Sequence, residues 1–342
     1  MGEMSVEITG QAAVLGAGSW GTALAVHLGT SGRDVSLWGR DAALLAEMSA
    51  RRANPTYLPD VAFPDRLRPT ASLEEALADS RYVILAVPSH GLRDVLRAAS
   101  AFIPAGAVLV SATKGLEVGS LHRMSQVAEA ETGGRFPVVV LSGPSFASEV
   151  ARRLPTALVA ASSDEDALRA VQHEFRGSYF RLYGSDDVVG VEIGAALKNI
   201  IAIAAGVVES LDLGHNAMAA LITRGLAEIS RLSCAMGGRR ETLAGLSGLG
   251  DLVLTCTGDL SRNRHVGLEL GRGRPLDEIL SGMKMVAEGV RSTSAALALG
   301  ATHGVELPIA SHMAEVLAGR ETPRDAVGAL MLRPQRGEMD GD

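Results

Sequence analysis

The chain has 342 residues, of which 47% are hydrophobic and 4% aromatic, and its formal net charge at pH 7 is −7. This length is enough for two domains with a large core, while the acidic balance argues against general affinity for nucleic acids. With two cysteines, no signal-like leader and no apolar run of membrane-span length, we expect no disulfide framework, secretion or membrane span, so the expected location is the cytoplasm.

Short apolar runs alternate with helix-like stretches in the first half of the chain. The runs predict strands over 12–16, 34–40, 82–88, 107–115, 137–145, 156–162 and 179–183. Helices are expected over 20–32, 41–52 and 164–175, and between the other runs. This alternation predicts an α/β doubly wound fold, in which a mainly parallel sheet carries helices on both faces.

After residue 188 the pattern becomes entirely helical. Helices are expected over 189–210, 217–236, 241–256, 262–271, 276–281, 292–303 and 311–318, with no strand among them. We therefore predict a sheet domain over residues 1–188 and an all-helical domain over residues 189–342, without a flexible linker. The polar tail after Leu332 is expected to fray.

The motif GAGSWG falls between the first expected strand and the first expected helix. Its glycines, Gly16, Gly18 and Gly21, permit a tight turn, close approach of a pyrophosphate and close packing of helix on sheet. The start of the helix adds free amides and the positive end of a dipole. Because further strand–helix units follow, we predict that the sheet domain is a Rossmann-like NAD(P)-binding domain, with Ser19 and Trp20 touching the cofactor. A purely structural turn, with Trp20 packed in the core, is the alternative.

The second expected strand ends in WGRD, at the position where a dinucleotide ribose is read. An acid there favours NAD, whereas a nearby arginine accepts the 2′-phosphate of NADP. Here Arg40 precedes Asp41, so NADP is favoured and NAD stays open. The alternative is that Arg40 is only a solvated loop charge.

Only three of the 32 basic residues are lysines: Lys114, Lys198 and Lys284. Lysine can lose its proton when it is desolvated, whereas arginine in practice cannot, so a retained lysine can mark chemistry. We interpret Lys284 as chance retention. Lys114 lies in SATKGLE at the carboxyl end of an expected strand, where doubly wound sheets bind ligands. We predict that it contacts substrate or cofactor, and a rim charge is the alternative.

A second loop at this edge, LSGPSFASE, contains Gly143, Pro144 and Ser145. Its position predicts that the loop faces the substrate. Ser145 is also a candidate N-cap for the next helix, with Glu149 in the first turn, and this role is compatible with an amide that faces the substrate.

Lys198 lies within the apolar stretch VEIGAALKNIIAIAAG, which opens the helical domain. Its neighbours on a helix are small or apolar, so its amine loses hydration, and desolvation lowers a lysine pKa toward neutrality. Such an amine can donate and accept the proton that a hydride transfer to a ketone requires. Asn199 can bond a hydroxyl or hold a loop, whereas Glu192 is poorly placed to pair with the amine. A lysine whose head group reaches water at the helix edge is the alternative.

Asp251 stands between Gly250 and an apolar run in GLSGLGDLVLTCTG. An acid in such surroundings needs a partner, and we predict Lys198. Asp251 would orient the amine or bind a substrate hydroxyl. The alternative, a helix N-cap, is compatible with this pairing.

The segment LSRNRHVG predicts an anion site at the start of a helix. Ser261 is the expected N-cap, followed by Arg262, Asn263 and Arg264 in the first turn. Arginines there oppose the helix dipole, and a bound phosphate would offset this cost. A solvated basic turn is the alternative. In VAEGVRST, Glu288 is expected in a loop before a helix, where it would bind a cofactor hydroxyl.

In chain order, GAGSWGTALA, ATKGLE, SGPSFASE, ALKNIIAIAAG, LITRGLAE, GLGDLVLTCTG, SRNRHVG and AEGVRST resemble the signature blocks of bacterial-type NAD(P)-dependent glycerol-3-phosphate dehydrogenases. The resemblance runs from about Ala13 to about Leu330. It implies reversible reduction of dihydroxyacetone phosphate to sn-glycerol 3-phosphate, which feeds glycerophospholipid synthesis, by a homodimer in which Lys198 donates and accepts the proton. The implied substrate contacts are Lys114, Gly143, Ser145, Lys198, Asp251, Ser261, Arg262 and Asn263. The implied cofactor contacts are Ser19, Trp20, Arg40, Lys114, Ala147, Arg262, Val286 and Glu288.

Two other functions fit parts of this pattern. A dehydrogenase for a keto acid, such as a β-hydroxyacid enzyme or a ketopantoate reductase, would use the basic SRNR turn to hold a carboxylate. A dinucleotide sensor without catalysis would have little need of Lys198. No metal site is expected.

Overall fold

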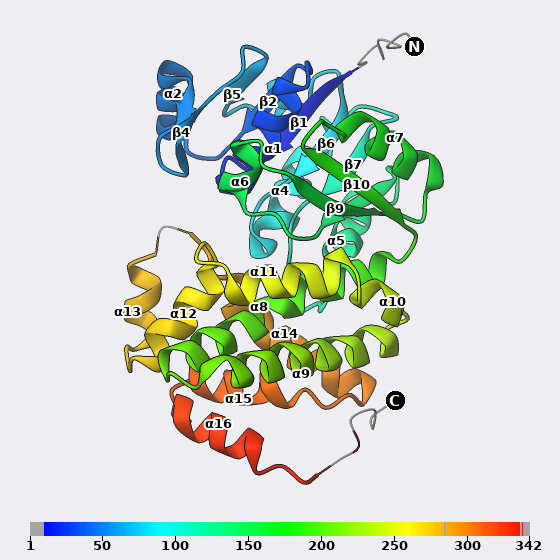
Figure 1. The fold of residues 1–342 in the computed structure, drawn as a ribbon. Helices are drawn as coiled ribbons and strands as arrows, with labels where there is room; N and C mark the ends of the chain where they lie inside the picture. Colours follow the sequence, from blue (N-terminus) through cyan, green and yellow to red (C-terminus); the bar gives the residue numbers. More distant parts are fainter. Residues whose placement is uncertain (1–9, 284, 336, 338–342) are drawn as a thin grey trace.

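The computed structural model describes residues 10–283, 285–335 and 337. The N-terminal segment that was examined for a signal, Lys284 and the end of the polar tail lie outside the described residues. A lobe built on a β-sheet lies above a lobe of helices (Figure 1). The chain passes from one to the other between β10 and α8, where Asp187 caps the helix by accepting a hydrogen bond from the Gly190 amide at 2.8 Å.

Eight strands form the main sheet, in the order β10-β9-β8-β7-β6-β1-β2-β5. All neighbours are parallel except β8 and β9, so the expected mainly parallel sheet is confirmed. The strands are β1 (Gln11–Leu15), β2 (Val35–Trp38), β5 (Leu67–Thr70), β6 (Ser80–Leu85), β7 (Val108–Ser111), β8 (Val138–Ser142), β9 (Thr156–Ala161) and β10 (Phe180–Ser185).

Three strands were not predicted. β3 (Ala53–Asn54) and β4 (Leu58–Ala62) form a separate antiparallel pair, and β5 lies at the edge of the main sheet. Their sequences carry no apolar run, and β5 includes Arg68 and Pro69, which are tolerated because only one neighbouring strand needs its backbone groups.

Helices cover both faces of the sheet because alternate residues of each central strand enter different cores. Val14 of β1 and Ile84 of β6 belong to one buried cluster, whereas Leu15 and Leu85 belong to another. Residues of α1 and α7 complete the first cluster and residues of α4 and α5 the second. The helices of this lobe are α1 (Ser19–Thr30), α2 (Ala42–Arg51), α3 (Leu73–Leu77), α4 (Leu92–Ala99), α5 (Met124–Thr132), α6 (Ala147–Ala151) and α7 (Glu165–Phe175).

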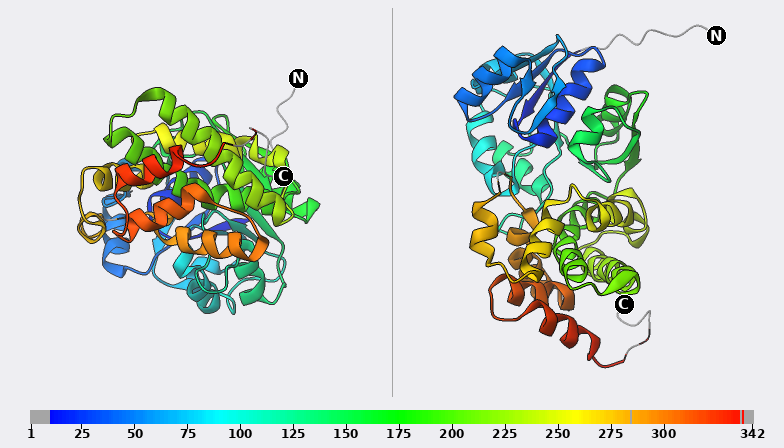
Figure 2. Two further views of the ribbon diagram at one scale, coloured as in Figure 1. Left: turned by 90° about the horizontal axis from the view of Figure 1, so that it is seen from below. Right: turned by 60° about the vertical axis from the view of Figure 1, so that its left-hand side comes forward.

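The second lobe contains the remaining helices, which stay grouped when the molecule is turned (Figure 2). They are α8 (Val188–Ser210), α9 (Gly214–Ala235), α10 (Arg240–Leu243), α11 (Asp251–Thr257), α12 (Arg262–Gly271), α13 (Leu276–Ser281), α14 (Glu288–His303), α15 (Pro308–Leu317) and α16 (Pro323–Met331). No strand is found among the residues described after 188. The final helix α16 was not predicted.

The prediction of a single helix over 241–256 is wrong. The segment divides into α10, a π-helical turn (Leu246–Gly250) and α11. Glycine is a poor helix former, and a side chain at Gly248 would begin 2.1 Å from the carbonyl oxygen of Leu243, so the chain folds back on itself there. This break places Asp251 at the start of a helix rather than in its interior.

Helix α8 is the core of the second lobe. Of the helices described, it alone is long and apolar enough to cross a membrane, and 89% of its most apolar window is buried inside the protein. Glu192 and Lys198 interrupt its apolar run, and its burial is that of a core helix. The backbones of α8 and α12 pack directly against each other where the helices cross. A side chain at Gly206 would begin 2.0 Å from the Arg264 carbonyl oxygen, so only glycine fits there.

Glu192 fastens α8 to the sheet lobe. Its buried carboxylate accepts hydrogen bonds from the Ser125 amide at 2.8 Å and the Ser125 hydroxyl at 2.6 Å, and it pairs with Arg123. Glu192 thus binds the start of α5 and not Lys198, in agreement with its position on the helix.

Candidate active site between the lobes

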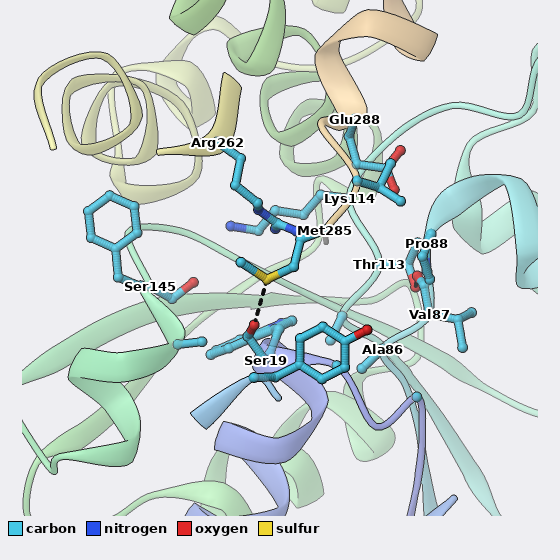
Figure 3. A pocket seen from close by; sticks show the side chains of 18 of the residues that line it. Ser19, Ala86, Val87, Pro88, Thr113, Lys114, Ser145, Arg262, Met285 and Glu288 are labelled. Atoms are coloured by element: carbon cyan, nitrogen blue, oxygen red, sulfur yellow. Dashed lines mark hydrogen bonds between the residues drawn. The ribbon is translucent and has the colours of Figure 1, made fainter. Parts of the chain in front are cut away.

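A pocket of about 570 Å³ lies between the two lobes. Its walls come from the carboxyl ends of five parallel strands of the sheet, from α8, α11 and α12, and from the segment that leads into α14. Figure 3 shows side chains that line the pocket. Fifteen of the predicted residues line it: Gly16, Gly18, Ser19, Trp20, Arg40, Lys114, Ser145, Ala147, Lys198, Asp251, Ser261, Arg262, Asn263, Val286 and Glu288. Gly21 and Gly143 do not reach the pocket surface.

The glycine-rich turn fits a dinucleotide pyrophosphate. Gly16 has φ +125°, and a side chain there would begin 2.5 Å from the Ala86 carbonyl oxygen. A side chain at Gly21 would begin 1.8 Å from the Gly16 carbonyl oxygen, so this glycine allows helix-on-sheet packing. At Gly18, by contrast, no described atom lies within 4 Å of that position, and no described side chain caps the start of α1. The turn therefore offers open space and free amides to an anion.

Two other residues of the motif have contacts within the protein. Trp20 is half-buried and packs against the core of the sheet lobe. The Ser19 hydroxyl donates a hydrogen bond to the sulfur of Met285 at 3.0 Å, so the segment before α14 reaches across the pocket (Figure 3).

The end of β2 presents an exposed arginine to the pocket. Arg40 lines it, whereas Asp41 is the N-cap of α2 and accepts hydrogen bonds from the Ala43 amide at 3.0 Å and the Leu44 amide at 3.1 Å. The acid of WGRD thus has a structural role at the start of a helix, and the cation faces the pocket.

Two lysines share one carboxylate at the far end of the pocket. Lys198 Nζ donates to Asp251 Oδ1 at 2.7 Å and to Thr255 Oγ1 at 2.7 Å. Lys114 Nζ donates to Asp251 Oδ2 at 2.8 Å and to the Gly143 carbonyl oxygen at 3.0 Å. The expected contact of Lys198 with Asp251 is present. The alternative of a lysine head group in bulk water is wrong, because the Lys198 side chain is only 7% exposed. Asp251 is not an N-cap either, since it is the first residue of α11 and the cap position before it is Gly250.

Burial sets the protonation of this group. Burial lowers the pKa of the Lys198 ammonium to about 8, and the charge of Lys114 adds to this effect, while Asp251 opposes it. Burial alone would raise the pKa of Asp251, but the two ammonium groups lower it overall, so the carboxylate stays ionised. The three groups carry one net positive charge in a sheltered cleft, which favours an anionic substrate.

Gly143 and Ser145 form a support behind Lys114. The Gly143 carbonyl oxygen accepts from Lys114 and also from the Ser145 hydroxyl at 3.0 Å. The alternative of Ser145 as an N-cap is wrong, because α6 is capped at Phe146. Glu149 does lie in the first turn of that helix.

The start of α12 has the predicted cap, since Ser261 Oγ accepts a hydrogen bond from the Arg264 amide at 3.2 Å. The interpretation of Arg264 needs correction. Its guanidinium pairs with Glu209 at 2.6 Å and Asp259 at 3.1 Å, so these carboxylates, and not a bound phosphate, offset its charge. Arg262 is exposed, and its guanidinium reaches into the pocket (Figure 3).

The Asn263 side chain is directed into the helical lobe. Its Nδ2 donates to Asn199 Oδ1 at 3.0 Å, and its Oδ1 accepts from the Gly289 amide at 2.9 Å. Asn263 and Asn199 therefore join the starts of α12 and α14 to α8 beside Lys198, which is the structural alternative that was open for Asn199.

Glu288 is not in a loop, as was predicted, but is the first residue of α14. Its carboxylate accepts hydrogen bonds from the Ser89 amide at 3.0 Å and the Ser89 hydroxyl at 2.6 Å. The carboxylate thus meets the sheet lobe at the pocket wall.

Sequence reasoning missed Thr255, whose hydroxyl accepts from Lys198 and donates to the Asp251 carbonyl oxygen at 2.6 Å. Its position four residues after Asp251 on one helix face was the available signal. Other pocket residues that were not singled out include Tyr57, Thr113, Phe146, Leu254, Leu260 and Met285.

Comparison with known proteins identifies the family of this chain. Residues 11–168 match the model for the N-terminus of NAD-dependent glycerol-3-phosphate dehydrogenase, and residues 187–328 match the model for its C-terminus. A glycerol-3-phosphate dehydrogenase (NAD(P)+) of Koribacter versatilis is 52% identical, with 96% of this chain and 98% of that protein covered. One of Thioalkalivibrio sulfidiphilus is 51% identical, with 96% and 98% covered. The crystal structure of glycerol-3-phosphate dehydrogenase from Coxiella burnetii has a TM-score of 0.92 at 41% identity, with 95% of this chain and 100% of that chain covered. The chain therefore belongs to the NAD-dependent glycerol-3-phosphate dehydrogenase family.

Proposed function

We propose that the protein catalyses the reversible NAD(P)H-dependent reduction of dihydroxyacetone phosphate to sn-glycerol 3-phosphate, a precursor for glycerophospholipid synthesis. The observation that carries this proposal is the buried Lys198 amine, which lines the same pocket as a dinucleotide-type turn and the Arg262 guanidinium. The names and high identity of the relatives support the same reaction.

The order of the loops along the sheet edge supports the division of the pocket. Arg40 follows β2, the glycine-rich turn follows β1, and Lys114 follows β7, while the sheet order is β7-β6-β1-β2. A dinucleotide with its adenosine near Arg40 and its pyrophosphate on the turn extends toward Lys114 and Lys198. When bound, NAD(P)H supplies a hydride to the substrate carbonyl carbon.

The chain's own residues hold the substrate and move the proton. Arg262 and the amides at the start of α12 hold the phosphate. Lys198 Nζ gives a proton to the carbonyl oxygen during reduction and takes one from the hydroxyl during oxidation. Asp251 and Thr255 fix the amine in place, and Lys114 adds positive charge beside the oxygen.

Initial-rate assays test this reaction directly. NAD(P)H oxidation is measured with dihydroxyacetone phosphate and with a panel of keto acids that includes ketopantoate. We expect turnover with the triose phosphate, and a preference for a keto acid would refute the assignment. Lys198→Ala should reduce kcat by about 100- to 10,000-fold, the usual contribution of a general acid–base group, while NADPH binding is retained. Binding without turnover in the unmodified protein would instead indicate a dinucleotide sensor.

We further infer a preference for NADP. Support comes from the exposed Arg40 guanidinium at the pocket and from the use of Asp41 as a helix cap. Arg40→Ala should raise KM for NADPH and leave KM for NADH nearly unchanged, because only NADPH carries the 2′-phosphate. An equal change in both values would contradict the preference.

We also infer a cytoplasmic homodimer with a domain boundary near residue 188. The family resemblance supports the dimer, the two unpaired cysteines agree with a reducing compartment, and the start of α8 supports the boundary. Light scattering on the purified protein measures the assembly, and limited proteolysis locates the boundary.

A further inference from the structure

Ser89 and Glu288 join the two lobes at one wall of the pocket. Ser89 begins the short helix η1 (Ser89–Gly91) after β6, and Glu288 begins α14 in the helical lobe. The carboxylate receives both donors of the serine, the amide at 3.0 Å and the hydroxyl at 2.6 Å. Ser89 is only 3% exposed, so water competes weakly for these bonds.

A glycine leaves the space for this contact. Gly115 has φ +144°, and a side chain there would begin 2.9 Å from Ser89 Oγ and 3.3 Å from Glu288 Oε2. Because Gly115 directly follows Lys114, the loop that carries this lysine packs against the serine–carboxylate pair. Three loops, which follow β6, follow β7 and precede α14, therefore meet at one point.

The opposite side of α14 is also held. The Gly289 amide donates to Asn263 Oδ1 at 2.9 Å, and a side chain at Gly289 would begin 2.6 Å from the Asn199 carbonyl oxygen. The start of α14 thus lies between Ser89 of the sheet lobe and the residue next to Lys198. If the contact with Ser89 is lost, the start of α14 is held only by its contacts with Asn263 and Asn199.

The sheet order places this contact along the cofactor. β6 lies beside β1 on the side away from β2. A dinucleotide that runs from Arg40 across the glycine-rich turn therefore passes the loop after β6 with its nicotinamide half. An ionised carboxylate has about four acceptor positions, and Ser89 uses two of those of Glu288, which leaves acceptors for the hydroxyls of the nicotinamide ribose.

We propose that Ser89 is a positioning residue for cofactor binding. Its two hydrogen bonds orient the Glu288 carboxylate toward the nicotinamide ribose and hold α14 against the sheet lobe at that end of the pocket. Ser89 acts through Glu288 and does not itself touch the reacting atoms. This role rests on the proposed NAD(P)-dependent function.

Equilibrium titration of NADH and NADPH, followed by the fluorescence of the bound reduced nicotinamide, tests the proposal in the full-length protein. Ser89→Ala should raise Kd about 5- to 20-fold, because a carboxylate that loses a hydrogen bond is no longer held in one orientation. KM for dihydroxyacetone phosphate at saturating cofactor should change less than twofold. Ser292→Ala is the matched control, since Ser292 lies on α14, is buried, and its hydroxyl has no partner among the described residues. Its Kd should equal that of the unmodified protein.

A second background separates positioning from general stability. In Glu288→Ala, the further change Ser89→Ala should raise Kd less than twofold, because the acceptor through which Ser89 acts is already absent. An unchanged Kd in Ser89→Ala, or the same fold-change in both backgrounds, would overturn the proposal. A lower Tm without a change in Kd would assign Ser89 a purely structural role and would also overturn it. Failure of the proposed reaction appears separately, as absence of triose phosphate turnover by the unmodified protein.

Discussion

Replacement of Asp251 by asparagine tests the electrostatics of the site most directly. The change keeps the size of the side chain and removes the charge that both Lys198 and Lys114 contact, at 2.7 Å and 2.8 Å. An amide can still accept one hydrogen bond, but its NH₂ group then faces the other ammonium. Lys198 is left buried beside a second positive charge.

The magnitude follows from the contacts. An opposite charge within about 4–6 Å changes a pKa by about 1–3, or about 1.4–4 kcal/mol. Without Asp251, the pKa of Lys198 should therefore fall from about 8 to about 5–7. Reduction of the ketone needs the ammonium form. At pH 7 the fraction of Lys198 in that form should fall from about nine-tenths to one-half or less.

The assay is the pH dependence of kcat/KM for dihydroxyacetone phosphate reduction, which reports groups of the free enzyme. In the unmodified protein the rate should decline as pH rises through about 8, and in Asp251→Asn the decline should begin about 1–3 pH units lower. Glu192→Gln is the control, because this buried carboxylate lies on the Lys198 helix but binds Ser125 and Arg123. Its profile should match the unmodified protein. A folded, NADPH-binding Asp251→Asn protein with an unmoved decline would refute the reasoning.

Three further changes test the anion site, the helix crossing and a buried acid. Arg262→Ala should raise KM for dihydroxyacetone phosphate about 10- to 100-fold in initial-rate assays, because a charged hydrogen bond to phosphate is lost; an unchanged KM would place the phosphate elsewhere. Gly267→Ala should lower the free energy of unfolding in urea by about 1–3 kcal/mol, because the new side chain on α12 would begin 1.9 Å from the Ile203 carbonyl oxygen of α8. The control Gly328→Ala should not destabilise the protein, since no described atom lies within 4 Å of the new side chain. Equal effects of the two changes would contradict the tight crossing of α8 and α12. Burial raises the pKa of Glu228 from 4.5 to about 7, although two hydrogen bonds from backbone amides of α15 act to lower it. Its protonated form is therefore favoured in the folded state, and this contribution, at most about 3 kcal/mol, is lost as pH rises from about 4.5 to about 7. Glu228→Gln should remove that part of the pH dependence of unfolding, and an identical dependence in both proteins would contradict it.

Most of the architecture could be predicted from local sequence patterns. Central strands of the sheet are buried on both faces, so their sequences are continuous apolar runs. The turn GAGSWG joins the first of these strands to a helix. Ser261 was recognisable as a cap because capping involves residues three positions apart. Lys198 stood out because its neighbours in sequence are apolar, and this apolar run forms the buried core helix of the second lobe.

The local patterns failed where a segment depends on a distant one. The edge strand β5 is held by a neighbour and not by its own apolar residues, and the helix expected over 241–256 breaks where glycines pack against the preceding turn. Arg264 looked like an anion ligand because Glu209, 55 residues earlier, could not be placed beside it.

Which residues could do chemistry was decided by residue type, spacing and local burial, all of which the sequence contains. Which of them meet was decided only by the tertiary structure. Asp251 reaches Lys198 across 53 residues and Lys114 across 137, and Ser89 reaches Glu288 across 199. Hydrogen bonds and charge pairs act over a few ångströms, so their partners are set by the packing of the two lobes and not by proximity along the chain.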